Sequence, residues 1–147
     1  MKKLRVYLDN CCFNRPYDDQ SRLRIRLETE AKLKIQEDIR SGLHGLVWSY
    51  ILDYENSRHP FPEKRDQILK WKRRSIVNVQ EDRMVLELAS FMGSKGLKRL
   101  DALHVACAKA AKCDWFLTTD EGILKRSTMI ENIKITDPIG FIKEVPT

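Results

Sequence analysis

Short runs of apolar, β-favouring residues alternate along this chain with segments of helical periodicity. The runs lie at residues 4–8, 43–49, 76–79, 115–118 and 133–135. Strands that alternate with helices predict a parallel sheet, because consecutive parallel strands must be joined by a crossover that packs on a face of the sheet. We therefore predict an α/β fold with three layers, in which helices cover both faces of a central, mostly parallel sheet.

The longest helical segment has an apolar residue at every fourth position, at Leu23, Leu27, Ala31 and Ile35. We expect this helix to begin at Ser21, a favourable N-cap residue, and to stop at Gly42. Residues 10–20 contain several turn-forming residues and predict a loop before it. Further helices are expected at residues 50–55, 63–74, 81–92, 100–111 and 122–126, and the tail lies at 138–144.

The composition is that of one folded domain with a basic balance of charge. The 147 residues carry 27 Lys and Arg against 21 Asp and Glu, a net charge of +6, and 42% of them are hydrophobic. The hydrophobic share excludes a disordered tail. An integral membrane protein is excluded because no apolar run approaches the roughly 18 to 20 residues that cross a bilayer. The four cysteines have no zinc-binding spacing. We expect a single domain over residues 1–147, a cytoplasmic location, and an anionic partner such as nucleic acid.

Acidic residues follow the predicted strands. Asp9 comes directly after the first strand, Glu55 lies on the helix after the second, and Asp120 follows the strand at 115–118. In an open α/β sheet, ligands bind in the crevice outside the carboxyl ends of the strands. We therefore expect these three acids at one edge of the sheet. Asp101 joins them if its helix begins at the same edge.

Carboxylates that lie close together cannot all ionise unless a cation lies between them, because like charges raise each other's pKa. Magnesium takes oxygen ligands and binds through a few carboxylates together with substrate phosphate. Two such ions, about 3.5 to 4 Å apart, activate a water and stabilise the leaving oxygen of a phosphodiester. An acidic metal site on a basic protein is the combination that cleavage of a phosphate backbone requires.

Four segments resemble, in order, the acidic motifs of PIN-domain nucleases: Val-Tyr-Leu-Asp-Asn at 6–10, Ile-Leu-Asp-Tyr-Glu at 51–55, Leu-Asp-Ala-Leu-His-Val-Ala-Cys-Ala at 100–108, and Phe-Leu-Thr-Thr-Asp at 116–120. The resemblance implies a PIN-like three-layer fold, dependence on Mg²⁺ or Mn²⁺, and ribonuclease activity on single-stranded or structured RNA. Many bacterial and archaeal relatives are VapC-like toxins that an antitoxin protein holds inactive and that assemble as homodimers.

Carried over by position, the resemblance makes four acids the catalytic, metal-binding residues: Asp9, Glu55, Asp101 and Asp120. Three neighbours are candidates for positioning these acids or a water, namely Asn10, Thr118 and Thr119. Family members often carry Ser or Thr at the position of Asn10, and an asparagine can also hydrogen-bond a carboxylate or a water. Candidate contacts to RNA are Arg15, Arg22, Lys70 and Arg74.

Each of these residues also has a purely structural interpretation. The aspartates are favoured as helix caps and at strand ends, and Asp53 competes with Glu55 as the acid of its helix. His104 shares a helix face with Asp101; we expect it to be packed and bonded to backbone rather than to contact metal or substrate. Trp71 either stacks on a base or packs inward while the charges around it are solvated.

Two other functions compete with the nuclease. A receiver-like domain would accept phosphate on an aspartate at a strand end, with one magnesium ion. A non-catalytic module would only bind RNA or a protein partner. A pure binder of polyanions gains nothing from four acids in its cleft, so we favour the metal-dependent ribonuclease.

Overall fold

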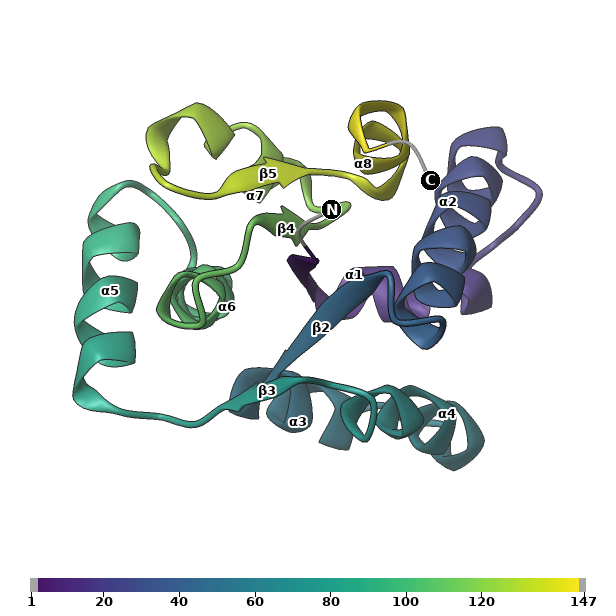
Figure 1. Ribbon diagram of the computed structural model, residues 1–147, viewed down its shortest axis with the longest axis horizontal. Coiled ribbons are helices and arrows are strands. Elements are labelled where there is room, and N and C mark those ends of the chain that lie inside the picture. The colour runs from purple at the N-terminus through teal and green to yellow at the C-terminus, as the bar shows by residue number, and fades with distance from the viewer. Residues whose placement is uncertain (1–2, 146–147) are drawn as a thin grey trace.

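A five-stranded sheet forms the centre of the fold (Figure 1). The computed structural model describes residues 3–145. The strands are β1 (Leu4–Leu8), β2 (His44–Ser49), β3 (Val77–Val79), β4 (Trp115–Leu117) and β5 (Lys134–Thr136). Their order across the sheet is β3-β2-β1-β4-β5, and every neighbouring pair is parallel. The predicted parallel sheet is confirmed, with β1 at its centre.

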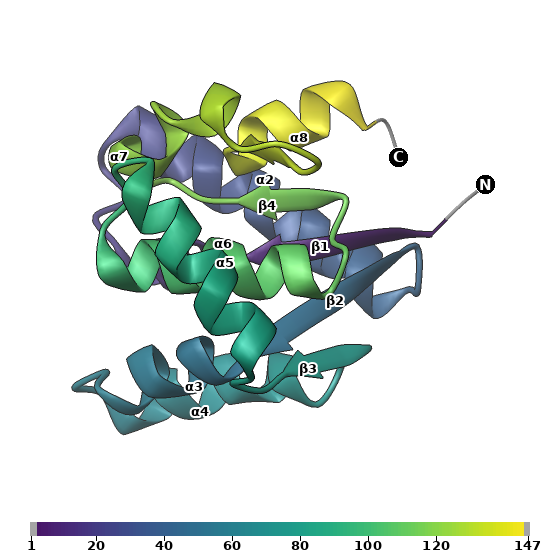
Figure 2. The same cartoon turned by 90° about the vertical axis from the view of Figure 1, so that its left-hand side faces the viewer.

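Helices cover both faces of the sheet and give the three predicted layers (Figures 1 and 2). One face carries α2 (Leu23–Arg40) and α8 (Pro138–Glu144), which pack together. The other carries α6 (Arg99–Ala110), and α5 (Arg83–Ser94) packs on the outside of α6. The remaining helices are α1 (Asn10–Asn14), α3 (Tyr50–Ser57), α4 (Pro62–Lys72) and α7 (Glu121–Leu124), with 3-10 turns at Arg15–Tyr17 and Ser127–Met129.

Most predicted strands and helices end within two residues of the observed ones, but the segment before α2 differs. The predicted loop at residues 10–20 is wrong for residues 10–17, which are helical, because the Asp9 side chain accepts a hydrogen bond from the Asn10 backbone and starts α1 directly after β1. Residues 18–20 are irregular, as predicted. Ser21 is not the N-cap of α2. That helix begins at Leu23, and no side chain caps it.

The apolar stripe predicted for α2 is buried at Ile35 but not in the first half of the helix. Leu23 and Leu27 are 60% and 45% exposed, whereas the polar side chains of Glu28 and Lys32 are buried. The turn that carries Arg15 packs against the helix, and its guanidinium lies 3.1 Å from a Glu28 carboxylate oxygen. Because α1 and this turn are helical, α2 meets them with a polar face that the spacing of leucines did not indicate.

Lys32 is buried in this face at a cost in stability. Its amino group donates to Gln36 Oε1 at 2.8 Å and lies 6.0 Å from the centre of the Phe13 ring. Burial lowers the pKa of Lys32 from 10.5 to about 8, so the folded chain disfavours the charged form. The shift corresponds to a loss of about 3 kcal/mol in the free energy of unfolding. This loss is complete below pH ~8, where the lysine is charged in both the folded and the unfolded chain.

We expect Lys32→Met to raise the free energy of unfolding at pH 7 by up to about 3 kcal/mol. Between pH ~8 and ~10.5 the unfolded chain holds the lysine proton more tightly than the folded chain, so the parent regains stability and the difference narrows. Urea unfolding of both proteins at pH 7 and pH ~10 measures this difference in stability. Burial also raises the pKa values of the Cys107 and Cys113 thiols to about 12, but both proteins contain these thiols, so their contribution cancels in the difference. A variant that is less stable at both pH values contradicts the prediction.

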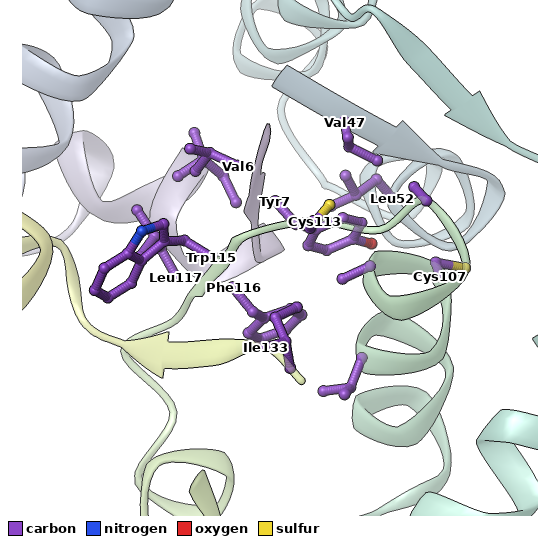
Figure 3. Packing of buried hydrophobic residues seen from close by; sticks show 14 of the residues in the cluster. Val6, Tyr7, Val47, Leu52, Cys107, Cys113, Trp115, Phe116, Leu117 and Ile133 are labelled. Carbon is purple, nitrogen blue, oxygen red and sulfur yellow. The ribbon is translucent and has the colours of Figure 1, made fainter. Parts of the chain in front are cut away.

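The central strands are buried on both faces, as a covered parallel sheet requires (Figure 3). Val6, Tyr7 and Phe116 have no exposed surface, and the Tyr7 and Phe116 rings stack with centroids 5.2 Å apart. This packing fixes β1 against β4 and therefore fixes the residues that follow each strand. Across residues 3–145, no helix combines the length and the apolar character that crossing a bilayer requires.

Candidate metal centre

Asp9 and Asp120 lie side by side because they follow adjacent parallel strands. Asp9 comes after β1, and its backbone N–H donates to the Leu117 carbonyl of β4 at 2.9 Å. Both carboxylates also cap helices, Asp9 at α1 and Asp120 at α7, where it accepts from Gly122 N at 2.7 Å. From β1 the chain continues to β2 and β3 on one side of the sheet and then to β4 and β5 on the other. The carboxyl ends of β1 and β4 are therefore the switch point at which ligands bind in open α/β sheets.

Thr118 links these two aspartates. Its hydroxyl donates to Asp9 Oδ2 at 2.8 Å and accepts from the Asp120 backbone N–H at 3.0 Å. The Thr118 side chain is completely buried. Thr119 approaches the site through its backbone, which lies 3.3 Å from Cys11 Sγ. Of the two predicted threonines, Thr118 is therefore the one whose side chain holds an acid.

Glu55, and not Asp53, is the acid that α3 contributes. Asp53 accepts from the Trp48 indole at 2.9 Å and pairs with Lys72 at 3.0 Å, so its carboxylate is engaged away from the other acids. Glu55 Oε1 accepts a hydrogen bond from His104 Nε2. The same imidazole nitrogen lies 3.6 Å from Asp9 Oδ1, which connects Glu55 to the end of β1.

His104 is the residue that sequence reasoning placed wrongly. It is buried, but its partners are side chains and not the backbone: Nδ1 lies 2.6 Å from the Tyr7 hydroxyl, which in turn lies 2.7 Å from Ser49 Oγ. Burial lowers the pKa of His104, but the carboxylates of Asp9 and Glu55 outweigh burial and raise it above its ordinary value. The one feature of the sequence that indicated a place near the acids was the spacing of three residues between Asp101 and His104, which puts both on one helix face.

Asp101 lies in the first turn of α6, half buried, at the same edge of the sheet. Burial raises the pKa of Asp101 to about 6, and the carboxylates of Asp120 and Asp9 add to this effect. Figure 2 shows why the acids meet: the N-terminus of α6 lies beside the carboxyl ends of β1 and β4. The structure thus brings the four predicted acids to one edge.

The acids of this site fit a hard divalent cation. Asp9, Glu55 and His104 each offer a ligand atom, and these atoms lie within 4.8 Å of one another. The carboxylate oxygens suit magnesium or manganese, whereas an imidazole is a ligand that zinc, copper, iron and nickel prefer. Asn10 Oδ1 is buried next to Asp9 and has no hydrogen-bond partner in the part of the chain that the structure describes, as expected of an oxygen that faces a cation or its water.

The predicted RNA-binding residues fall into two groups. Arg15 and Arg22 line a small hollow together with Thr119, so they lie near the acids, although Arg15 also pairs with Asp18 and Glu28. Lys70 and Arg74 lie elsewhere, because α4 runs back toward the start of β3. These two basic residues are at the amino edge of the sheet and do not line the acidic site.

Comparison with known proteins supports this fold. The structure is similar to the crystal structure of VapBC2 from Rickettsia felis bound to a DNA fragment from their promoter. The TM-score is 0.55 over 91% of this chain and 98% of the matched chain, at 14% sequence identity. No family model matches the sequence, and neither does any curated protein. At this identity the likeness concerns the fold alone, and it confirms the predicted PIN-like three-layer arrangement.

Proposed function

We propose that this protein is a divalent-metal-dependent endoribonuclease that hydrolyses phosphodiester bonds of single-stranded or structured RNA. One observation carries the proposal: residues far apart in the sequence bring ligand atoms of Asp9, Glu55 and His104 within 4.8 Å of one another, beside Asp101. A cluster of carboxylates repels a polyanion unless a cation lies between them. The net charge of +6 favours an anionic substrate despite this acidic cluster. The likeness of the fold to a VapBC2 complex agrees with this function.

Mg²⁺ or Mn²⁺ would be held by Asp9, Glu55, Asp101 and Asp120, with His104 beside them as the residue that orients Glu55. When bound, such an ion lowers the pKa of a water and neutralises charge on the leaving oxygen. The chain's own side chains prepare the site. Thr118 fixes the orientation of Asp9, and His104 fixes that of Glu55. Burial and the neighbouring carboxylates raise the pKa of Asp101 to about 6, and a cation bound between these acids would favour its ionised form.

The test is cleavage of single-stranded RNA by the purified protein. We expect cleavage with Mg²⁺ or Mn²⁺ and none with a chelator, and calorimetry should detect Mn²⁺ binding without RNA. Binding of RNA that is insensitive to chelator, with no cleavage of any RNA tested, would favour a non-catalytic binding module and overturn the proposal.

The hydroxyl of Thr118 is expected to contribute about tenfold or more to metal affinity, because groups that orient ligands typically contribute 10- to 100-fold. Thr118→Val keeps the shape of the side chain but removes its bonds to Asp9 and to the Asp120 backbone. Titration of Mn²⁺ measures the loss, and Thr118→Ser should restore most of the affinity. Thr128→Val, at an exposed position, is the matched control. Equal affinity of Thr118→Val and parent would exclude this role.

We also propose that the protein is the toxin of a toxin–antitoxin pair, with an antitoxin partner and a second copy of this chain. Its structural relative is a VapBC2 complex. Helix α5 offers apolar surface to a second copy, since Met84 and Phe91, seven residues apart and so on one side of the helix, are 51% and 54% exposed. Light scattering is expected to give twice the chain mass of 17.3 kDa, and Phe91→Glu should reduce it toward one chain. A monomeric parent at micromolar concentration contradicts the homodimer.

A further inference from the structure

A basic hollow lies at the amino edge of the sheet, away from the acids. It has a volume of about 390 Å³, and its lining combines one glutamine and one tryptophan with four cations: Arg40, Gln67, Lys70, Trp71, Arg73 and Arg74. No carboxylate lines it. Its residues come from the C-terminal ends of α2 and α4 and from the two residues after α4.

The hollow and the acidic site lie at opposite edges because every strand points the same way. Arg40 ends α2 just before β2 begins, and Arg74 lies just before β3 begins. Asp9 and Asp120, in contrast, follow the ends of β1 and β4. Strands of five or six residues at about 3.3 Å per residue separate the two edges by roughly 17 to 20 Å. Figure 2 shows the C-terminus of α4 beside the start of β3.

Two of the four cations of this hollow have a side-chain partner: Lys70 donates to Gln67 Oε1 at 3.4 Å, and Arg40 is ion-paired. Lys72, the neighbour that is outside the lining, pairs with Asp53, and Arg40 pairs with Glu37 at 2.6 Å. Arg73 and Arg74 form no ion pair within residues 3–145. Arg40 also lies over the Trp71 ring, with its guanidinium carbon 5.2 Å from the ring centre, which holds it at the wall of the hollow.

Helix dipoles explain only part of this arrangement. A cation in the last turn of a helix is stabilised by the carbonyl groups exposed there, which accounts for Arg40 on α2 and Lys70 on α4. The dipoles give no reason for the cations of two helices to line one hollow, where they repel each other. An anionic ligand between them removes that repulsion, and guanidinium groups match the geometry of phosphate oxygens.

A second basic hollow lies at the same edge and favours an extended ligand over a single phosphate. Lys109, Lys112 and Lys134 line it beside the starts of β1 and β4, together with one carboxylate, Asp114, which accepts a hydrogen bond from the Arg5 backbone at 2.8 Å. The first hollow lies at the starts of β2 and β3 and the second at the starts of β1, β4 and β5, so together they extend along an edge that is about 19 Å wide at 4.8 Å per strand spacing. A polymer with regularly spaced phosphates can contact both, and single strands follow basic grooves of this kind over several nucleotides.

We propose that the hollow formed by Arg40, Lys70, Arg73 and Arg74 binds the phosphodiester backbone of a single-stranded RNA at the amino edge of the sheet. Naming RNA as the polyanion rests on the proposed function. The binding itself does not, because it needs neither a metal ion nor the acids. The hollow anchors the strand, and the acids at the opposite edge act on another part of it.

The experiment measures RNA affinity without cleavage, by fluorescence anisotropy of a labelled strand of about 20 nucleotides in excess chelator. Arg73→Gln with Arg74→Gln is expected to weaken binding at least about tenfold and to reduce the slope of log affinity against log salt by about 1.4, which is about 0.7 per lost phosphate contact. The matched control removes two charges elsewhere, by Arg83→Gln on α5 and Lys143→Gln on α8, and should change affinity less than about twofold. Arg73→Lys with Arg74→Lys keeps the charges and should retain most of the affinity.

Two results overturn the inference. The first is an RNA affinity of the Arg73 and Arg74 variant equal to that of the parent. The second is an equal loss of affinity in the control, because binding then follows net charge and not the hollow. If RNA affinity stays equal while binding of polyglutamate falls, an acidic protein segment is the ligand. Chelator-insensitive binding through the hollow by a protein that cleaves no RNA contradicts the proposed function and leaves this inference standing.

Discussion

Asp9→Asn is expected to lower metal-dependent RNA cleavage by at least about 100-fold. Groups that only orient metal ligands contribute 10- to 100-fold, so the loss of a buried ligand should cost more. The substitution keeps the size of the side chain, and its amide oxygen can still accept the hydrogen bond from Asn10 N that starts α1. What it removes is the negative charge beside Glu55 and Asp101.

The measurement is the initial rate of cleavage with Mn²⁺, together with calorimetric titration of Mn²⁺ in the absence of RNA. Asp66→Asn is the charge-matched control, since Asp66 is an exposed carboxylate on α4, and it should cleave at the parental rate. Asp120→Asn should behave like Asp9→Asn. If both site variants cleave as fast as the parent, the activity comes from a contaminating nuclease and the proposed function is wrong.

The acids of this site were predictable because topology, and not local sequence, brings them together. Once the alternation of strands and helices indicates a parallel sheet, all carboxyl ends lie at one edge, and so do Asp9 and Asp120. Glu55 was harder, since Asp53 is also a carboxylate and lies two residues nearer to the end of β2. Only the tertiary contacts of Asp53 with Trp48 and Lys72 decide between them.

The environment of His104 could not be predicted, because its partners are distant in the sequence. Tyr7 precedes it by 97 residues and Glu55 by 49. A histidine among alanines in a helix is compatible with ordinary packing, and only the assembled site shows that its ring lies between a buried hydroxyl and a carboxylate. The buried face of α2 was missed for the same reason, since it is set by Arg15 and its turn.

The positions of Lys70 and Arg74 were predictable in part, from the direction of the chain. Two helices, α3 and α4, join β2 to β3. The first leaves the carboxyl edge of the sheet, so the second must return to the amino edge before β3 can begin in parallel. A basic cluster directly before a strand therefore lies opposite to acids that follow strands.

Tyr7→Phe is expected to weaken Mn²⁺ binding by about 10- to 100-fold, although Tyr7 contributes no ligand atom. Its hydroxyl joins Ser49 Oγ at 2.7 Å to His104 Nδ1 at 2.6 Å, and His104 holds Glu55 through its other nitrogen. Burial raises the pKa of Tyr7 well above 10, so the hydroxyl keeps its proton and can donate one hydrogen bond. Without it, the His104 ring loses the contact that fixes its orientation.

The substitution should also lower the free energy of unfolding by about 1 to 3 kcal/mol, since Ser49 Oγ and His104 Nδ1 lose a buried partner. Phenylalanine keeps the stacking on Phe116, so urea unfolding should remain one cooperative transition. Tyr17→Phe is the matched control, because Tyr17 is 40% exposed, and should change neither quantity.

Stability and metal affinity together identify what the Tyr7 hydroxyl does. A hydroxyl that only fills a gap in the core lowers stability when it is removed and leaves the Mn²⁺ titration of the folded protein unchanged, which would contradict the positioning role. If the hydroxyl orients His104, its removal lowers both stability and Mn²⁺ affinity, because the metal must then fix the imidazole and the Glu55 carboxylate as it binds. RNA affinity in chelator should be equal in Tyr7→Phe and parent, since the basic hollow at the amino edge does not touch this hydrogen-bond chain.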